Sequence, residues 1–145
     1  HFTPSRLKGK SVLRLWVEHL ALCAMGQLKE GEVSVLHCSD ESRAFAAVSA
    51  SQASTWLADF VAIYREGMQR PLPLFPSASY RLCSESLSKA EQDWEGGEYT
   101  HKGDSEDPYI QLAWRGCTGS PIGLEEHVTL AQRVYGAACL AGLVP

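Results

Sequence analysis

The chain has 145 residues, of which 45% are hydrophobic and 21% are charged, and its formal net charge is −4. These values indicate one globular domain with a real core, and they exclude a surface that is basic throughout. No apolar run approaches the ~18 residues that a membrane-spanning helix needs. We therefore predict a single soluble domain over residues 1–145, cytoplasmic and without a membrane partner. Because the chain begins with His1 rather than Met, we expect a piece excised from a longer subunit.

Five scattered cysteines form no CxxC pair: Cys23, Cys38, Cys83, Cys117 and Cys139. Their odd number and wide spacing argue against both a disulfide framework and a zinc site. On an apolar face a free cysteine acts as a small hydrophobe. We expect no bound metal and no cofactor.

Residues 1–17 contain four basic side chains and no acid: Arg6, Lys8, Lys10 and Arg14. Such a segment can contact phosphates, and the simpler interpretation is a solvated leader. Ser11 is expected to cap a helix that ends near Gly26. Its apolar residues recur at helical spacing and predict a buried stripe: Leu13, Trp16, Val17, Leu20 and Ala24.

Residues 32–48 predict a β-hairpin. Val33 and Val35 alternate with polar neighbours, and a second apolar run follows over residues 43–48. The polar residues 39–42 supply turn chemistry between the two runs. An isolated hairpin is marginal in water, so it must pack on the helices or join a larger sheet.

A wide apolar face predicts a long helix that opens at Ser51 or Ser54. We expect this whole face to be core: Ala53, Trp56, Leu57, Phe60, Val61, Tyr64 and Met68.

Three prolines end this helical spacing: Pro71, Pro73 and Pro76. Proline lacks a backbone donor and disfavours helical geometry in the residue before it. Residues 64–76 therefore predict a helix end near Gly67, an extended connector and a helix start. We expect its apolar side chains to fold back on the preceding helix rather than wait for a partner: Leu72, Leu74 and Phe75.

A third helix is predicted over residues 77–94, with a narrow apolar stripe: Tyr80, Cys83, Leu87, Ala90 and Trp94. A short helix is expected from Pro108 to Gly116, and a last helix from Leu124 to Ala138. The apolar tail, residues 140–145, is expected to dock on the body or on a partner.

The loop between the helix predicted over residues 77–94 and the one that begins at Pro108 is acidic. Four of its residues resemble a calcium or magnesium site: His101, Asp104, Glu106 and Asp107. Their spacing matches no calcium loop, and Asp107 precedes Pro108 as a helix cap should. We therefore predict a solvated loop whose carboxylates cap helices.

The element order predicts an α+β domain in which the hairpin packs with four to five helices. No nucleophile elbow, phosphate-binding glycine loop or metalloprotease helix occurs. The histidines are scattered, and His19, beside an apolar face, is expected to be structural.

Three stretches, in this order, resemble the C-terminal region of the RecC (gamma) subunit family of bacterial exodeoxyribonuclease V. They are residues 6–20, residues 64–76 (YREGMQRPLPLFP), and residues 94–99 followed by residues 105–116. Three ordered matches are more specific than one short motif, and together they span most of residues 6–116.

The resemblance implies a restriction-endonuclease-like fold, related to the nuclease domain of the partner subunit RecB. Active members of that fold hold magnesium with an Asp and an Asp/Glu-x-Lys motif on adjacent strands. Here the second predicted strand, residues 43–48, contains no acid and no lysine, and Asp40 falls in the turn. The resemblance thus implies an inactive remnant without catalytic residues. Its role would be to scaffold RecB-like and RecD-like subunits and to guide DNA in double-strand-break repair and recombination.

The residues that match the family motifs are expected at subunit interfaces: Tyr64, Arg65, Glu66, Gly67, Pro71, Leu72, Pro73, Phe75, Pro76, Asp107, Pro108, Tyr109, Trp114 and Arg115. Possible contacts to the DNA backbone are Arg6, Lys8, Lys10 and Arg14. Two alternatives stay open. One is an active magnesium-dependent nuclease or hydrolase that uses the acidic loop 101–107, and the other is a helical protein-interaction module unrelated to DNA.

Overall fold

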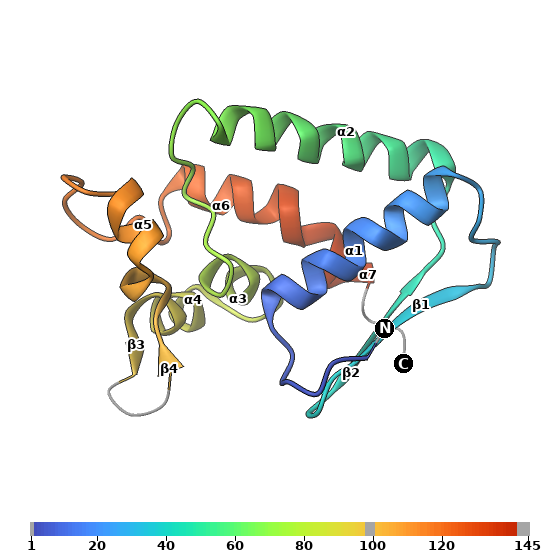
Figure 1. The fold of residues 1–145 in the computed structure, drawn as a ribbon, viewed down its shortest axis with the longest axis horizontal. Helices are drawn as coiled ribbons and strands as arrows, with labels where there is room; N and C mark the ends of the chain where they lie inside the picture. Colours follow the sequence, from blue (N-terminus) through green and yellow to red (C-terminus); the bar gives the residue numbers. More distant parts are fainter. Residues whose placement is uncertain (1, 98–100, 142–145) are drawn as a thin grey trace. The chain divides into compact units, whose positions relative to one another are not determined.

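The computed structural model describes residues 2–97 and 101–141, with only the backbone of His101. The predicted α+β class is confirmed: helices combine with a small two-stranded antiparallel sheet and a second, shorter ladder (Figure 1). The chain forms two compact units. Unit 1 comprises residues 1–65 and 137–145, and unit 2 comprises residues 66–136. Each unit is described by itself.

Unit 1 begins with helix α1 (Gly9–Ala24). The helix starts two residues before the predicted cap Ser11, and Lys8 at its N-cap makes no side-chain capping bond. The predicted stop is confirmed, because Gly26 adopts a positive φ of 66° just after the helix. Val12 and Leu15 are buried in place of Leu13 and Val17. The buried stripe is rotated because a polar residue, His19, also occupies the core.

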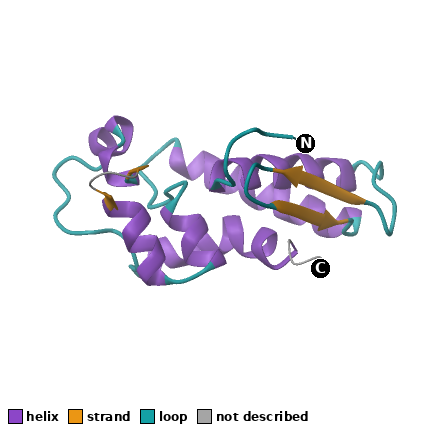
Figure 2. Cartoon of the chain, turned by 90° about the horizontal axis from the view of Figure 1, so that it is seen from below, coloured by secondary structure: helices purple, strands orange, loops and turns teal. Residues whose placement is uncertain are grey.

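The predicted hairpin is confirmed as β1 (Val33–His37) paired antiparallel with β2 (Ser42–Ala46) (Figure 2). The buried face of the hairpin contains Leu36 and Phe45, which are fully buried, whereas Val33 is 48% exposed. Ser34 pairs with Phe45 across the ladder and shares its face. A serine faces the core here because its hydroxyl has a partner there, the His19 ring.

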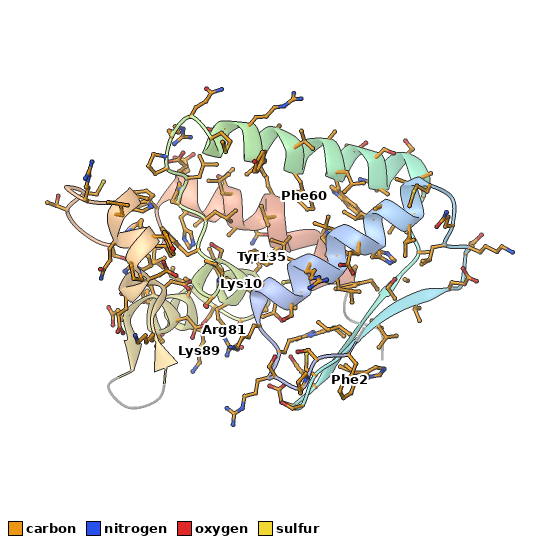
Figure 3. The ribbon with its side chains drawn as sticks, viewed as in Figure 1. Phe2, Lys10, Phe60, Arg81, Lys89 and Tyr135 are labelled. Atoms are coloured by element: carbon orange, nitrogen blue, oxygen red, sulfur yellow. The ribbon has the colours of Figure 1, made fainter. Side chains whose placement is uncertain are left out.

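The leader preceding α1 is held along β1. Phe2, which is labelled in Figure 3, forms a parallel bridge with His37. The Thr3 N–H donates to the His37 carbonyl at 2.9 Å, and the Ser39 N–H donates to the Ser5 carbonyl at 3.1 Å. The leader therefore covers one edge of the hairpin.

Helix α2 (Ala50–Gly67) is confirmed, but it opens before Ser51 and Ser54. The Ser49 hydroxyl accepts the Gln52 N–H at 3.2 Å, so Ser49 serves as the cap. Only part of the predicted face is core.

Ala53 and Ile63 of α2 are buried. The Trp56 ring packs at 5.5 Å on Trp16, the largest buried side chain of unit 1. The far end of the face is exposed, which overturns the prediction for Val61, Tyr64 and Met68. Helix α7 (Ala137–Ala141) completes unit 1 by contacting α1 and β2. The last four residues of the predicted apolar tail lie outside the described residues.

In unit 2 the helix predicted over residues 77–94 is two helices, α3 (Ala78–Ser84) and α4 (Leu87–Glu95). The chain leaves helical geometry at Glu85. Ser86 then caps α4, its hydroxyl accepting the Lys89 N–H at 3.3 Å. The helix breaks here although the apolar spacing continues, because serine is more favourable at a helix N-cap than inside a helix.

The acidic loop contains more structure than predicted. Strands β3 (Gly96–Gly97) and β4 (His101–Lys102) form a short ladder, followed by the 3-10 helix η1 (Asp104–Glu106). Paired glycines gave no strand signal. Gly96 is required because its φ is +78° and because a Cβ there would clash with the backbone nitrogen of Gly103.

Helix α5 (Pro108–Ala113) follows, capped as predicted by Asp107, and the turn after it contains Gly116 at a φ of +85°. The predicted last helix is divided into α6 (Glu125–Ala131), the π-helical turn η2 (Gln132–Gly136) and α7. In the part of the chain that the structure describes, no helix combines the length and apolarity needed to cross a membrane.

Candidate functional site

The connector motif meets the later motifs in an aromatic cluster at the centre of unit 2. Phe75 is 1% exposed, and its ring centroid lies 4.5 Å from Trp94, 5.9 Å from Trp114 and 5.8 Å from His127. Ala78, Ala90 and Ile122 share this core. Phe75 is therefore buried as predicted, but in a core built by the segments that follow it.

A second contact ties the connector to the acidic loop. The Asp104 carboxylate accepts the N–H groups of Ser77 and Ala78, both at 2.8 Å, and so caps the start of α3. Glu106 accepts the Gly103 N–H at 3.2 Å. Asp107 accepts the N–H groups of the first turn of α5. All three carboxylates thus serve backbone donors, as the capping interpretation predicts.

The described residues contain no group of three His, Cys, Asp or Glu side chains placed to hold a metal ion. The His101 side chain, which belonged to the hypothetical metal set, lies outside the described residues.

A buried histidine fixes the connector from the other side. His127 Nδ1 accepts the Gly123 N–H at 3.1 Å, so Nε2 carries the proton and faces Ser79 Oγ at 3.2 Å. Ser79 Oγ also accepts the Phe75 N–H at 2.9 Å. Burial lowers the pKa of His127, which favours this neutral form. Ser79 was missed from sequence because a lone serine in a helical segment carries no distinctive signal.

Unit 1 contains a similar arrangement around His19. Its Nε2 lies 3.1 Å from the Ala46 carbonyl oxygen, and its Nδ1 lies 2.9 Å from Ser34 Oγ. Burial lowers the pKa of His19. The ring joins α1 to both strands of the hairpin, so the structural role predicted for His19 is confirmed.

The predicted interface residues divide by exposure. Pro73 and Phe75 are buried, so packing alone explains them. Partly buried are Glu66, Leu72, Pro76, Asp107 and Trp114. Exposed are Tyr64, Arg65, Gly67, Pro71, Pro108, Tyr109 and Arg115. The two tyrosines stand out at 68% and 82% exposure. Only the exposed members offer whole side chains to a partner.

The connector itself is pinned by charge. Arg70 binds the carboxylates of both Glu66 and Glu126, which joins the end of α2 to α6 within unit 2. These side chains are about half exposed, so the pairing orders the connector more than it stabilises the fold.

The predicted DNA-contacting residues lie together at the start of α1. Arg6, Lys8 and Lys10 are exposed and have no ion pair among residues 2–97 and 101–141, whereas Arg14 pairs with Glu18 at 3.0 Å. The first turn of α1 contains no acid, and its N-cap side chain makes no capping bond. Free cations and a helix N-terminus both favour an anion.

The hairpin contains no carboxylate in either strand, VSVLH or SRAFA, and no lysine. Asp40 in its turn accepts the Leu7 N–H at 2.8 Å and the Glu41 N–H at 3.1 Å. Asp40, the single Asp of the hairpin, therefore holds the leader in place.

Two cysteines lie in environments that disfavour nucleophilic activation. Each of the five is a thiol rather than part of a disulfide. Burial, together with the charges of Asp40 and Glu41, raises the pKa of Cys38, and burial raises the pKa of Cys139. A raised pKa reduces the thiolate fraction on which reactivity depends.

Comparison with known proteins places these features in a family. The RecC C-terminal domain family matches residues 1–86. The chain is also 29% identical, over 147 residues, to the RecBCD enzyme subunit RecC of Escherichia coli (strain K12). That match covers 90% of this chain but only 13% of the length of the relative. The chain belongs to the RecC C-terminal domain family.

Proposed function

We propose that the chain is a non-catalytic module of a RecC-type subunit, a restriction-endonuclease-like remnant that works in the cytoplasm. It scaffolds RecB-like and RecD-like subunits of an exodeoxyribonuclease V complex and helps to guide DNA strands during double-strand-break repair and recombination. Family membership and the likeness to a RecBCD enzyme subunit support this proposal.

The positions of the carboxylates support the proposal that the chain is non-catalytic. A metal-dependent nuclease of this fold needs acids on adjacent strands, close enough to share an ion. Here the strands have none, and Asp40, Asp104 and Asp107 accept backbone N–H groups. The hairpin keeps the packing role of a sheet without its chemistry.

The scaffolding part rests on the exposed motif residues. The exposed motif residues include three large side chains, Tyr64, Tyr109 and Arg115. Tyrosine and arginine are enriched at protein interfaces, because they bury much area at low entropic cost or form paired hydrogen bonds. Their exposure is consistent with subunit contacts.

A nuclease assay separates the proposal from the acidic-loop alternative. We expect no cleavage of linear DNA by the chain with magnesium or manganese. The matched variant replaces Asp104, Glu106 and Asp107 by Asn, Gln and Asn, which retain an oxygen acceptor for the caps. Cleavage by the native chain that this variant loses would establish the acidic loop as a nuclease site.

Salt dependence tests the guiding role. We expect weak, sequence-blind binding of a forked duplex that declines steeply between low and physiological salt, because phosphate contacts release counterions. Lys8→Ala with Lys10→Ala should lower the salt slope by about two. Lys29→Ala, an exposed cation after α1, is the control. Affinity that does not change with salt would contradict an electrostatic contact.

A further inference from the structure

A groove of about 330 Å³ opens beside α5 in unit 2. Its apolar wall comes from Trp94, Ile110, Trp114 and Pro121. Its polar lining includes Ser105, Gln111 and Arg115, and the glycine-containing loop after α5 also lines it. A concave site of mainly apolar surface with a few polar groups is the usual form of a recognition site.

The charge of the groove is unusual for its surroundings. None of its lining residues is an acid. Arg115 has no carboxylate partner within the described part of the chain, whereas Arg70 and Arg81 each bind two carboxylates. An unpaired guanidinium beside tryptophan surface favours a carboxylate supplied from outside, because a planar fork binds it through two parallel hydrogen bonds.

We propose that this groove docks a short segment of a partner subunit, in which an apolar side chain neighbours an acidic residue. This inference rests on the proposed scaffolding function and names the chemistry of the partner. The apolar side chain lies against Trp94 and Trp114, and the carboxylate binds Arg115. The Gln111 amide nitrogen donates to the Ser105 carbonyl at 3.1 Å, which leaves its oxygen to accept a backbone N–H of the segment.

A peptide fits this groove better than a nucleic acid does. Single-stranded nucleic acid needs a positively charged track along several phosphates, and the groove offers one cation. The adjoining residues 85–107 are rich in acids. These acids repel a polyanion more strongly than they repel a peptide with one carboxylate, which pairs with Arg115.

The apolar wall of the groove packs against the buried core of unit 2. The Phe75 ring contacts both tryptophans, at 4.5 Å and 5.9 Å, and the Phe75 N–H is held by Ser79. A preformed wall reduces the entropy lost on binding. The motif residues Phe75, Trp94 and Trp114 therefore shape the groove, while Arg115 supplies its specificity.

The test uses overlapping fluorescein-labelled peptides that tile the proposed RecB-like and RecD-like partner subunits. Anisotropy titration of the full chain should identify a peptide with adjacent apolar and acidic residues. Arg115→Ala should weaken its binding at least about tenfold, as expected for loss of a charged hydrogen-bonded pair. Lys102→Ala, an exposed cation of unit 2 outside the groove, should leave binding unchanged.

Two further readouts show that the contact is in the groove. Replacing the acidic residue of the peptide by lysine should restore binding to Arg115→Glu. The bound peptide should also slow alkylation of Cys117, an exposed thiol that lines the groove. The inference is overturned if no tiled peptide depends on Arg115, or if single-stranded DNA rather than peptide protects Cys117.

Failure of this inference can be told apart from failure of the proposed function. Assembly of the chain with RecB-like and RecD-like subunits is followed by size-exclusion chromatography. A complex that forms equally well with Arg115→Glu refutes the groove and leaves the scaffolding function standing. A native chain that joins no complex refutes the scaffolding function itself.

Discussion

Replacing Phe75 by alanine removes the central side chain of the aromatic cluster in unit 2. The ring is 1% exposed and contacts Trp94, Trp114 and His127. Truncating a buried phenylalanine usually costs about 3–5 kcal/mol of unfolding free energy, from lost transfer energy and the cavity left behind.

The structure places this variant in the upper half of that range, at about 4–5 kcal/mol. The cavity cannot collapse easily, because Pro73 and Pro76 restrict the connector and the Phe75 N–H is bound to Ser79. Each lost aromatic pair adds about 0.5–1.5 kcal/mol beyond buried area. Phe75→Leu keeps most of the volume and should cost only about 1–2 kcal/mol.

Urea unfolding measures this cost, and amide hydrogen exchange locates it. Protection should fall in α3 and α4 and change little in α1, because the cavity opens within unit 2. Tyr109→Ala, at 82% exposure, is the control and should change stability by less than about 0.5 kcal/mol. A midpoint for Phe75→Ala equal to that of the control, with exchange unchanged, would refute the core role. Impaired subunit assembly at an unchanged midpoint would instead assign Phe75 to an interface.

Three further changes test other contacts. Asp104→Ala removes the cap from two N–H groups at the start of α3 and should cost about 1–2 kcal/mol in thermal unfolding, with Asp104→Asn closer to the native value. Gly96→Ala should destabilise the β3–β4 ladder, seen as faster exchange at Lys102, because a Cβ would clash with the backbone. Stability should be full above pH ~6.5 and decline as the pH falls below it, because burial lowers the folded-state pKa of His19 and His127, so that the unfolded chain binds protons that the native chain does not. Urea midpoints between pH 5 and 8 measure this, and His127→Gln should flatten the decline.

Local signals predicted the elements well where the chain carries explicit start and stop residues. Gly26 ends α1, and Asp107 with Pro108 begins α5, as the capping chemistry requires. The hairpin followed from two apolar runs separated by a polar turn. In each case the deciding interaction lies within a few residues of the signal.

Predictions failed where a tertiary contact decided. His19 occupies the core, which rotated the buried stripe of α1, and its bond to Ser34 turned that serine inward and left Val33 exposed. Periodicity treats histidine as polar, so it placed Leu13 and Val17 in the buried stripe of α1. The break between α3 and α4 was missed because apolar spacing continued through Ser86.

The site was only partly accessible from sequence. Motif resemblance marked Phe75, Trp94 and Trp114, but it did not show that their rings meet. Asp104 was expected to cap a helix, yet the helix that it caps begins 26 residues earlier, at Ala78. No local pattern connects positions so far apart, and the groove beside Arg115 exists only because these segments converge.

Co-assembly with the neighbouring subunits tests the central claim most directly. The chain is mixed with the proposed RecB-like and RecD-like partner subunits, and the mass of the eluting species is measured by light scattering during size-exclusion chromatography. The scaffolding account predicts one complex that contains the chain. The chain itself adds no cleavage activity to that complex. Elution of the chain alone, at its monomer mass and with the partners unbound, would contradict it and favour an interaction module unrelated to this complex.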